Sequence, residues 1–520
     1  INDGDRISIR DFGYEILGTA TTTDDPITSL HTFRKRSGEN ILMRSYDTYL
    51  QYYEEGNDTW ESLRTTSTAD AIYGYADYNI NTNLRSYVYF GNATDNFARW
   101  TGAHTLIDGV VTAGDATINV VDANDFLATG TVILCGDEAT YSGKTATSLT
   151  GVSGAIDCAD ERSITQAIQE FPSNPKGNIY LNANNRIFIA GVTSTPQAIY
   201  FSKYGDAETY LTTLVSNSTA DAAGIFNLGE GGGAVTGMVM DEGSIYAFKK
   251  SIVYKIVLSD SLYTLQPLKP FDGRSQTTGS LTARSVFVGG NGVYYITPDR
   301  KIISLQRVDG IDYPQLVPIS DPIAPTVDNA YFDDVSGISW RDYAFFTLKA
   351  SPDVDVNNTV LLFNEKVNAW ETPLIGWSAS EFAVYDNGDG DGESLYFGDA
   401  STANVYKVID GATDNGLDVT ANWRTKRFDF GVPQSLKEMS ELYVEGYITD
   451  NTTIKISLLL DEDGFTQTFT TEFAGTETDY KFNATPYNIL GLHPFGFMRF
   501  GSNEEVGKTK FRIYLSKDFR

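Results

Sequence analysis

The sequence predicts an all-β protein: a β-propeller of about seven blades, with a small β module inserted into it and a β-sandwich after it. Strand-forming residues dominate the 520-residue chain, which has 31 Tyr, 29 Phe and 41% hydrophobic residues. This composition suits a globular protein with a large buried core and room for two or three domains. Turn dipeptides recur between short apolar runs. Helical periodicity is weak throughout, and the best helical candidate, residues 164–170, is short.

The propeller prediction starts from residues 31–63, which contain three short strand patterns joined by tight turns, at 41–45, 49–54 and 59–63. The last hairpin recurs far along the chain, because residues 53–61 align with residues 363–371. The aromatic residue at the first position, the Glu at the third, the Trp at the eighth and the final Glu keep their spacing. An aromatic residue before the turn and a Trp after it can pack across the two strands and fix the register. This pattern is typical of the outer hairpin of a kelch-like propeller blade.

Residues 1–104 are expected to form the first blades, and the next segment changes in character. Residues 105–162 have few aromatic residues and many Thr, Ala, Gly and Asp, with strand patterns at 117–120 and 130–134 and a hairpin at 139–144. We interpret this segment as a small β module inserted into a blade loop, where insertions are tolerated best. The chain should then enter and leave the module at neighbouring points, and the module should be dispensable for folding.

The blade pattern resumes over residues 163–415. Each unit repeats a strand of small residues, a turn, an aromatic-rich strand, a turn and a further strand, and the units lie at 177–202, 237–256, 285–305, 337–370 and 381–408. Radial repetition of such sheets predicts a propeller with seven blades, and six or eight remain alternatives. Residues 416–520 have longer strands with strict alternation, which predicts a C-terminal β-sandwich; the clearest alternation places Ile454, Ile456, Leu458 and Leu460 on one face.

The charge of the chain limits its partners. The net charge is −29, from 39 basic and 68 acidic residues. Ordinary nucleic-acid binding is disfavoured, because phosphate contacts need clustered Lys and Arg. The only basic run, Arg34, Lys35 and Arg36, is expected to be a solvated turn. No segment approaches about 18 consecutive apolar residues, so no membrane span is predicted.

The two cysteines, Cys135 and Cys158, lie in the predicted module. They could form a disulfide, or they could be two separate small hydrophobic residues, and the sequence favours neither. The chain has no CxxC motif and no Cys/His cluster, which argues against a structural zinc site.

Three further motifs contain residue types found in functional sites. The run DNGDGDGE at residues 386–393 suits a Ca²⁺ loop in part, but counted from Asn387 its ninth and twelfth positions are Leu395 and Gly398, so a solvated hairpin loop is the preferred interpretation. The run GEGGG at residues 229–233 fits no phosphate-loop spacing and is interpreted as a connection between blades. The three histidines, His31, His104 and His493, lie in different regions with no serine in a nucleophile-elbow context.

These observations lead us to assign no catalytic, cofactor-binding or metal-ligating residue and to predict that the chain is not an enzyme. A glycosidase carboxylate pair can be neither located nor dismissed among so many Asp and Glu. Six N-x-[S/T] sites occur, and Asn- and Thr-rich turns generate such sites by chance; they are Asn57, Asn92, Asn217, Asn357, Asn451 and Asn483.

Several stretches together resemble structural proteins of tailed-bacteriophage virions. The blade sequence MRSYDTYLQYY at residues 43–53, followed by YNINTN at 78–83, is similar to the first blade of propeller-bearing phage tail proteins. The module resembles a small β module found inside many virion proteins, through TINV at 117–120, GTVIL at 130–134 and YSGKTATSLTG at 141–151. The C-terminal LGLHPFG at 490–496 is also similar to such proteins.

The resemblance implies a virion protein of the tail nozzle, tail tip or head–tail connector, assembled in a ring of copies. Its implied partners are other virion proteins and further copies of itself, with duplex DNA only as a passing neighbour and no membrane. A subunit of charge −29 could supply an acidic channel wall that repels DNA, although the same charge could serve only solubility. The alternative function is a carbohydrate-binding adhesin or receptor-binding protein; a secreted glycan-cleaving enzyme is a weaker third.

Overall fold

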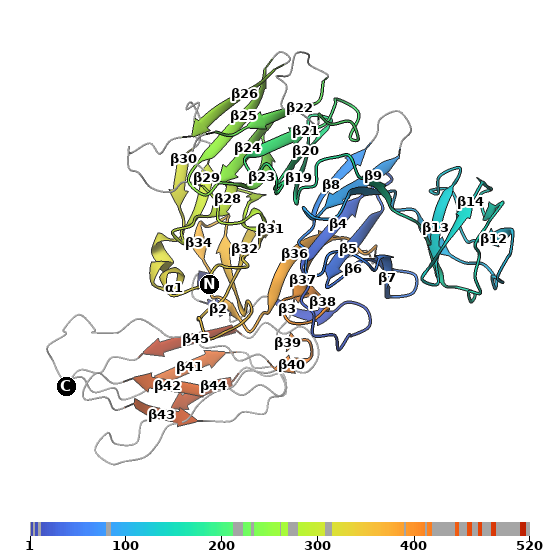
Figure 1. The fold of residues 1–520 in the computed structure, drawn as a ribbon. Helices are drawn as coiled ribbons and strands as arrows, with labels where there is room; N and C mark the ends of the chain where they lie inside the picture. Colours follow the sequence, from blue (N-terminus) through green and yellow to red (C-terminus); the bar gives the residue numbers. More distant parts are fainter. Residues whose placement is uncertain are drawn as a thin grey trace, which may run out of the picture. The chain divides into compact units, whose positions relative to one another are not determined.

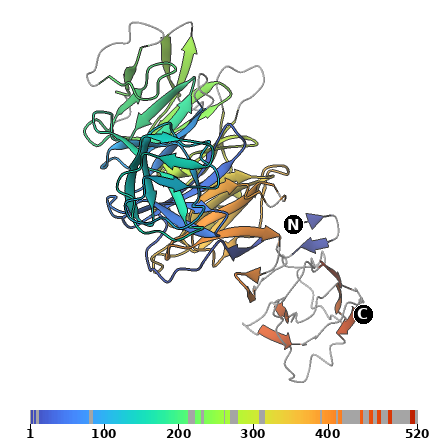
Figure 2. The same cartoon turned by 90° about the vertical axis from the view of Figure 1, so that its right-hand side faces the viewer.

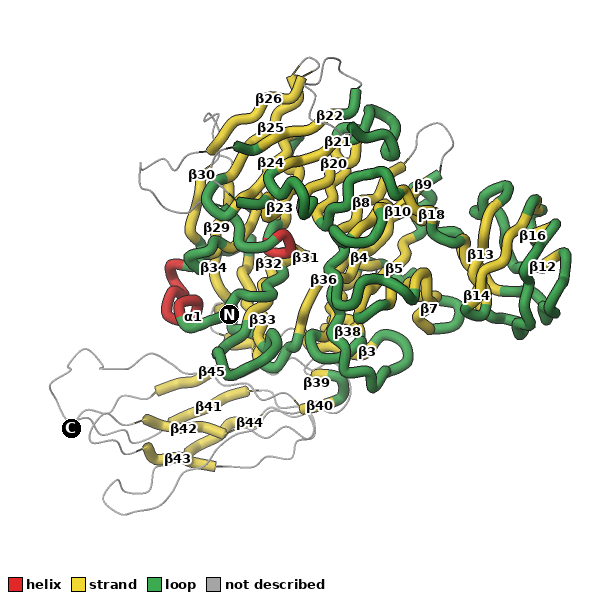
Figure 3. Tube along the Cα trace, viewed as in Figure 1, coloured by secondary structure: helices red, strands yellow, loops and turns green. Residues whose placement is uncertain are grey.

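The structure is a computed structural model. It describes residues 2–3, 6–8, 12–79, 85–211, 222–229, 233–259, 262–268, 279–306, 315–388, 390, 392–410, 413–418, 442–446, 455–459, 466–470, 480–484 and 510–515. The chain divides into two compact units, one of Leu17–Val405 and one that combines Ile1–Ile16 with Tyr406–Arg520. Strands make up most of the described chain, as the strand colouring in Figure 3 shows, which confirms the all-β prediction.

The unit of Leu17–Val405 contains a series of antiparallel sheets that follow one another along the chain (Figure 1). The first sheet is β4 (Ser29–Arg34), β5 (Asn40–Tyr46), β6 (Tyr49–Glu54) and β7 (Thr59–Arg64). The second is β8 (Gly74–Asn79), β9 (Ser86–Gly91), β10 (Phe97–Trp100) and, after the inserted segment, β18 (Gln169–Phe171). The third is β19 (Ile179–Ala183), β20 (Arg186–Ala190), β21 (Ala198–Phe201) and β22 (Gly224–Asn227).

Four more groups of strands continue the series. The fourth sheet is β23 (Val235–Asp241), β24 (Ser244–Lys249), β25 (Val253–Ser259) and β26 (Leu262–Leu268). The fifth is β27 (Phe287–Gly289), β28 (Gly292–Ile296), β29 (Ile302–Gln306) and β30 (Gln315–Pro318). The sixth is β31 (Gly337–Trp340), β32 (Tyr343–Leu348), β33 (Thr359–Asn364) and β34 (Ala369–Trp370), with β35 (Leu374–Ile375) also pairing with β33. The seventh group begins with the hairpin of β36 (Ala379–Tyr385) and β37 (Ser394–Asp399).

The described helices are short and lie in connections between these sheets. They are the 3₁₀ turns η1 (Ala283–Ser285) and η2 (Asp321–Ile323) and the single-turn helix α1 (Ala324–Asp328). No described helix is long and apolar enough to cross a membrane.

The first strands of the seven groups lie next to one another in chain order. β4 contacts β8, β8 contacts β19, and the series continues through β23, β27, β31 and β36, which in turn contacts β4. Between the last and the first sheets, Tyr385 and Tyr396 share a buried apolar cluster with Leu42 and Tyr53. Between the first two sheets, Phe33 and Trp100 belong to a second buried apolar cluster. Apolar side chains between successive sheets therefore form the core, and no described sheet closes into a barrel.

The repeated hairpin is confirmed at the level of backbone register. Tyr53 pairs with Trp60 between β6 and β7, and Phe363 pairs with Trp370 between β33 and β34. Both hairpins are formed by the third and fourth strands of their sheets. Their turns match as well, because Asp58 and Asn368, at equivalent positions, have φ of 53° and 51°. Asp and Asn tolerate this left-handed conformation better than most residues.

The inserted segment forms its own β structure and lies to one side of the sheets in Figure 1, where it is cyan; in Figure 2 it faces the viewer. One of its sheets has the order β11-β17-β13-β14 and the other has the order β12-β16-β15. Their strands are β11 (His104–Leu106), β12 (Thr117–Asn119), β13 (Gly130–Leu134), β14 (Asp137–Tyr141), β15 (Gly143–Lys144), β16 (Ser148–Thr150) and β17 (Ser163–Gln166). A separate apolar core that includes Ile118, Phe126 and Leu149 fills the segment.

Pairing of β11 with β17 brings together the points where the chain enters and leaves the insert, as expected. Residues 164–170, the stretch with the clearest helical periodicity, are not helical, in line with the all-β prediction. These residues belong to β17 and β18, which pair with β11, β13 and β10, partners distant in sequence that outweigh a short helical pattern.

In the second unit, the N-terminal strands join the C-terminal sheet. The order is β1 (Asn2–Asp3), β2 (Arg6–Ser8), β45 (Lys510–Leu515), β41 (Leu442–Gly446) and β44 (Tyr480–Ala484), and β42 (Lys455–Leu459) forms a hairpin with β43 (Thr466–Thr470). A further set of strands begins with β3 (Phe12–Ile16), which pairs with β38 (Val405–Asp410) and β39 (Thr413–Asp414). β39 in turn pairs with β40 (Leu417–Asp418). The division at residues 104, 162 and 415 and the C-terminal sandwich stay predictions.

Candidate functional site

Charged and polar side chains gather on the first strands of several successive sheets, and we take them as the candidate site. Glu381 of β36 is the centre of one group. Its carboxylate accepts a hydrogen bond from Ser336 Oγ at 3.1 Å and lies 3.5 Å from Arg284 Nη1, which comes from η1. Arg284 also lies 3.6 Å from Asp334. The Glu381 and Arg284 side chains are only 16% and 14% exposed, so their charges interact where water screens little.

Burial raises the pKa of Glu381 to about 7, and the charge of Arg284 and the hydrogen bond from Ser336 oppose that rise without cancelling it. The carboxyl group therefore changes its charge near neutral pH, where an ordinary Glu would be ionised. Chemically it could accept or release a proton in this range, and the hydrogen bond from Ser336 would change with it.

Tyr75 of β8 belongs to a second polar group. The Tyr75 ring stacks on His31 of β4, with centroids 4.7 Å apart and planes 1° apart, and its hydroxyl lies 3.1 Å from Ser29 Oγ. Burial raises the pKa of Tyr75, and the negative charge of Glu381 contributes in the same direction. His31 Nε2 lies 2.8 Å from Asp77 Oδ1, whose other oxygen accepts from the Arg34 backbone N–H at 2.9 Å.

These contacts join different sheets. His31 and Asp77 link the first sheet to the second, and Glu381 links the seventh to the connections before the fifth and sixth. The carboxylates, the guanidinium and the hydroxyls all have partners within the protein. The arrangement therefore fixes the first strands of these sheets relative to one another. One of its carboxyl groups, that of Glu381, titrates near neutral pH.

The sequence did not single out Glu381, Arg284, Tyr75 or Asp77. One signal was present: in the otherwise apolar strand 379–385, Glu381 is the only charged residue. A charged residue inside a buried strand needs a partner, which marks it as a position to examine. The partner, Arg284, lies about a hundred positions earlier and could not be paired with it from sequence.

The three histidines are not brought together. His31 lies in the candidate site, and His104 lies where the insert joins the first sheet, with Nε2 3.6 Å from Glu54 Oε2. His493 lies outside the described residues. Glu54 also accepts from Ser163 Oγ at 3.2 Å, and Ser163 bonds the Tyr52 hydroxyl at 2.6 Å. Polar contacts thus fix both ends of the insert to β6.

The acidic run at 386–393 forms the connection between β36 and β37. Glu393 lies 3.1 Å from Arg34 Nη2 and its side chain is 55% exposed, and Gly388 N donates to Asp386 Oδ1 at 3.0 Å. Residues 389 and 391 lie outside the described residues, as do 230–232 of the glycine-rich run. Among described side chains, no group of three or more His, Cys, Asp or Glu is placed to hold a metal ion.

The basic run is the solvated turn expected for it except at Lys35, because Arg34 and Arg36 are exposed. Lys35 is only 7% exposed and forms ion pairs with Glu39, at 2.6 Å, and with Asp125 of the insert. A charged side chain in such a position is retained through its partners. Two of the N-x-[S/T] positions are also structural: Asn92 caps the N–H groups of Thr94 and Asp95, and Asn357 is 2% exposed.

Cys135 and Cys158 form a disulfide, which settles the alternative that the sequence left open.

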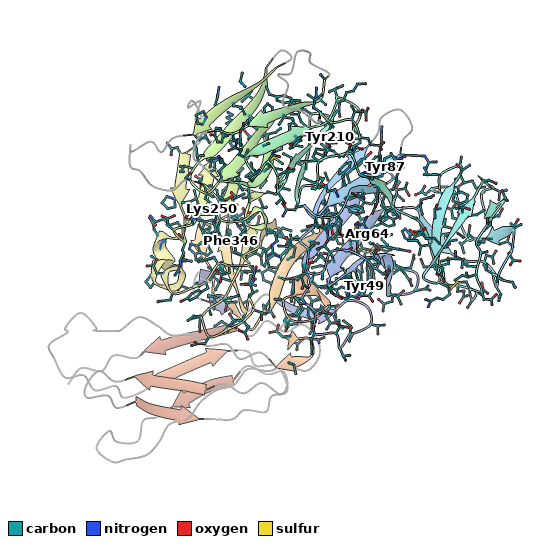
Figure 4. All side chains as sticks on the ribbon, viewed as in Figure 1. Tyr49, Arg64, Tyr87, Tyr210, Lys250 and Phe346 are labelled. Carbon is teal, nitrogen blue, oxygen red and sulfur yellow. A yellow bond between two sulfur atoms is a disulfide. The ribbon has the colours of Figure 1, made fainter. Side chains whose placement is uncertain are left out.

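Arg64, labelled in Figure 4, lies between the first two sheets. It contacts Glu170, Asp95 at 3.8 Å and the Tyr73 hydroxyl at 3.4 Å.

Comparison with known proteins gives no family. No protein-family model matches the sequence, and no curated protein matches it. One of the solved structures that resemble the chain is Raptor from Chaetomium thermophilum, with a TM-score of 0.36 and 9% sequence identity. The match covers 78% of this chain and 29% of that one, so this chain spans less than a third of its length.

Proposed function

We propose that the seven groups of strands from β4 to β37 are the seven blades of a β-propeller. The observation that supports this is the succession of contacts between first strands, which runs from β4 through β36 and back to β4. Radial repetition of four-stranded sheets with their first strands innermost produces this order. The matching hairpins at Trp60 and Trp370, both formed by the third and fourth strands, support equivalent positions in two blades.

We further propose that the chain is a structural component of a tailed-bacteriophage particle. The sequence resemblance at residues 43–53, 78–83 and 117–151 supports this proposal, and the succession of contacts adds a single scaffold from which the insert extends. The role fits a tail nozzle, tail tip or connector, with copies in a ring around the DNA channel and other virion proteins as neighbours. At a net charge of −29 the chain would repel a passing duplex.

Electron microscopy of the purified full-length chain, with its mass measured by light scattering, tests this proposal. We expect rings of several copies, with a lumen lined by more Asp and Glu than Lys and Arg. A chain that stays monomeric in its native particle would overturn the role, and so would a lumen lined mainly by Lys and Arg.

One observation favours the alternative of carbohydrate binding. Tyr204 is 49% exposed, and its hydroxyl accepts a hydrogen bond from Asn185 Nδ2 at 3.0 Å, so an aromatic ring is held in a fixed orientation at the surface. Such a ring can stack on the apolar face of a sugar. A glycan array would show binding that Tyr204→Ala abolishes and that Tyr204→Phe weakens, because Phe keeps the ring but loses the bond from Asn185. An array without signal would remove this alternative and leave the structural role untouched.

A further inference from the structure

The disulfide joins two parts of the insert that backbone pairing leaves apart. Cys135 lies in the turn between β13 and β14. Cys158 lies in the segment that returns toward β17, where its N–H and carbonyl bond Val111 at 2.9 Å in both directions. The bond closes a loop with a sequence separation of 23, and these are the only two cysteines in the chain.

The conformation of the turn indicates that Cys135 serves the disulfide and not the turn. Leu134 pairs with Asp137 across a two-residue turn, in which Cys135 has φ 46° and Gly136 has φ 90°. Such a turn favours Asn, Asp or Gly at its first position, because other side chains resist positive φ. A Cys here is unfavourable for the turn itself. Its side chain is exposed, whereas Cys158 is 4% exposed.

The segment fixed by Cys158 also carries a contact between the insert and the first sheet. Asn57 of the β6–β7 turn donates from Nδ2 to the Glu161 carbonyl at 3.0 Å. Glu161 N–H in turn donates to the Ile107 carbonyl at 3.1 Å, and Ile107 N–H donates to the Arg162 carbonyl at 2.9 Å. The disulfide lies three residues from this contact, so it limits how far the docking segment can move.

We propose that the insert is a redox-sensitive module, held in its docked form by the Cys135–Cys158 disulfide and released by a low-molecular-weight thiol. A thiolate attacks the exposed Cys135 sulfur, forms a mixed disulfide there and expels the Cys158 thiolate, which takes up a proton. A second thiolate attacks the sulfur of the reagent in the mixed disulfide and frees the Cys135 thiolate, which is protonated in turn. Two electrons pass from two thiols to the protein, and the thiols leave as one disulfide.

The consequence is a module whose order depends on its surroundings. In an oxidising medium the bond persists, and in a reducing one it opens. The rest of the described chain has no cysteine, so the sheets from β19 to β37 should not respond. This inference does not depend on the proposed virion role.

Hydrogen–deuterium exchange of the full chain, with and without reduced glutathione at millimolar concentration, tests the proposal. Thiol titration should find two thiols per chain after reduction. Exchange in residues 107–112 and 157–162 should rise about tenfold or more, because the closed loop no longer restrains them. Exchange in β23–β26 should stay unchanged.

Two variants separate the bond from the turn. Cys135→Asn removes the disulfide but suits the turn, so any rise in exchange would report the bond alone. Cys158→Ser serves as a second reduced form if the first gains stability from its better turn. The proposal fails if the two thiols titrate while exchange in the insert stays the same, or if glutathione leaves the native disulfide intact.

Discussion

The rings of Tyr53 and Trp60 lie directly across the β6–β7 hairpin, with centroids 5.4 Å apart and planes at 55°. Phe363 and Trp370 repeat the arrangement across β33–β34, at 5.1 Å and 58°. Such aromatic pairs stabilise a hairpin beyond the area that they bury. The two tryptophans differ in their further contacts: Trp370 Nε1 donates to the Ile319 carbonyl at 2.6 Å, which ties its hairpin to the preceding sheet, and the Arg44 guanidinium lies 4.1 Å from the Trp60 ring centroid.

Replacing these tryptophans should show both the likeness and the difference. Both side chains are partly buried, so each change to Ala should lower the free energy of unfolding by about 2 kcal/mol, less than for a fully buried ring. Trp370→Phe should cost about 1 kcal/mol more than Trp60→Phe, because it leaves the Ile319 carbonyl without its donor. Urea unfolding followed by fluorescence measures the differences. Equal costs for the two Phe variants would contradict the role of the Nε1 contact.

The conserved spacing of Glu in the two hairpins also has a structural basis. Glu55 accepts from the Tyr385 hydroxyl, and Glu365 accepts from Gly290 N–H and Ser339 Oγ, both at 2.9 Å. Glu55 therefore bonds the seventh group of strands, and Glu365 bonds both the fifth sheet and its own sixth sheet.

Glu365 should matter more than its counterpart. It is 7% exposed, so Glu365→Ala would leave a buried N–H and a hydroxyl without an acceptor and should cost about 2–3 kcal/mol. Glu55 is exposed, and Glu55→Ala should cost about 1 kcal/mol. The comparison requires the same unfolding assay for both variants. A larger loss for Glu55→Ala would show that burial does not rank these two contacts.

Glu381 predicts a pH dependence of stability. Because its pKa in the folded protein is raised to about 7 from an ordinary value of 4.5, the folded state holds the proton more tightly. Stability is then fully present below pH 4.5 and is lost as the pH rises through 7, with a total of up to about 3 kcal/mol.

Glu381→Gln should remove this dependence, since its carbonyl oxygen can still accept from Ser336 without a charge. The variant should match the parent at pH 5 and exceed it at pH 8, in thermal melts recorded at both values. Parallel curves for parent and variant across this range would show that Glu381 does not titrate there.

Removing the insert should leave the sheets folded. Leu106 pairs with Ser163, so residues 107–162 can be replaced by Asn-Gly, which closes the two strands as a short hairpin. Ser163 and Gln166 stay, because they bond Tyr52 and Trp100 Nε1. We expect a soluble protein whose main melting transition drops by a few degrees at most, since Ile164 becomes exposed. Insoluble protein, from a design that keeps these contacts, would contradict the independence of the insert.

Sequence patterns succeeded where the partner of a strand is its neighbour in the chain. The strands expected at residues 41–45 and 49–54 are β5 and β6, because turn residues and alternation fix such hairpins locally. They gave no strand at residues 164–166, whose pairing depends on β11 and β13, partners distant in sequence. Much of the predicted C-terminal sandwich, including residues 490–496, lies outside the described residues.

The candidate site was harder to predict than the fold for the same reason. Glu381 and Arg284 meet only because segments about a hundred residues apart come side by side, and His31 and Asp77 meet only because the first two sheets do. For the acidic run at residues 386–393 and the basic run at 34–36, the sequence offers local composition alone. Local composition could not reveal that Arg34 and Glu393 are partners across the two ends of the unit.

The packing of the first sheet against the last has a consequence for synthesis of the chain. Leu42 and Tyr53 are buried against Tyr385 and Tyr396, and Arg34 bonds the carbonyl of Val384, a residue 350 positions later. A ribosome adds roughly 5–20 residues per second, so the first sheet waits roughly 20–70 s for the side chains that cover it. During that interval its apolar face is open to water and to other nascent chains, and the yield of native protein should depend on chaperones that shield this one sheet.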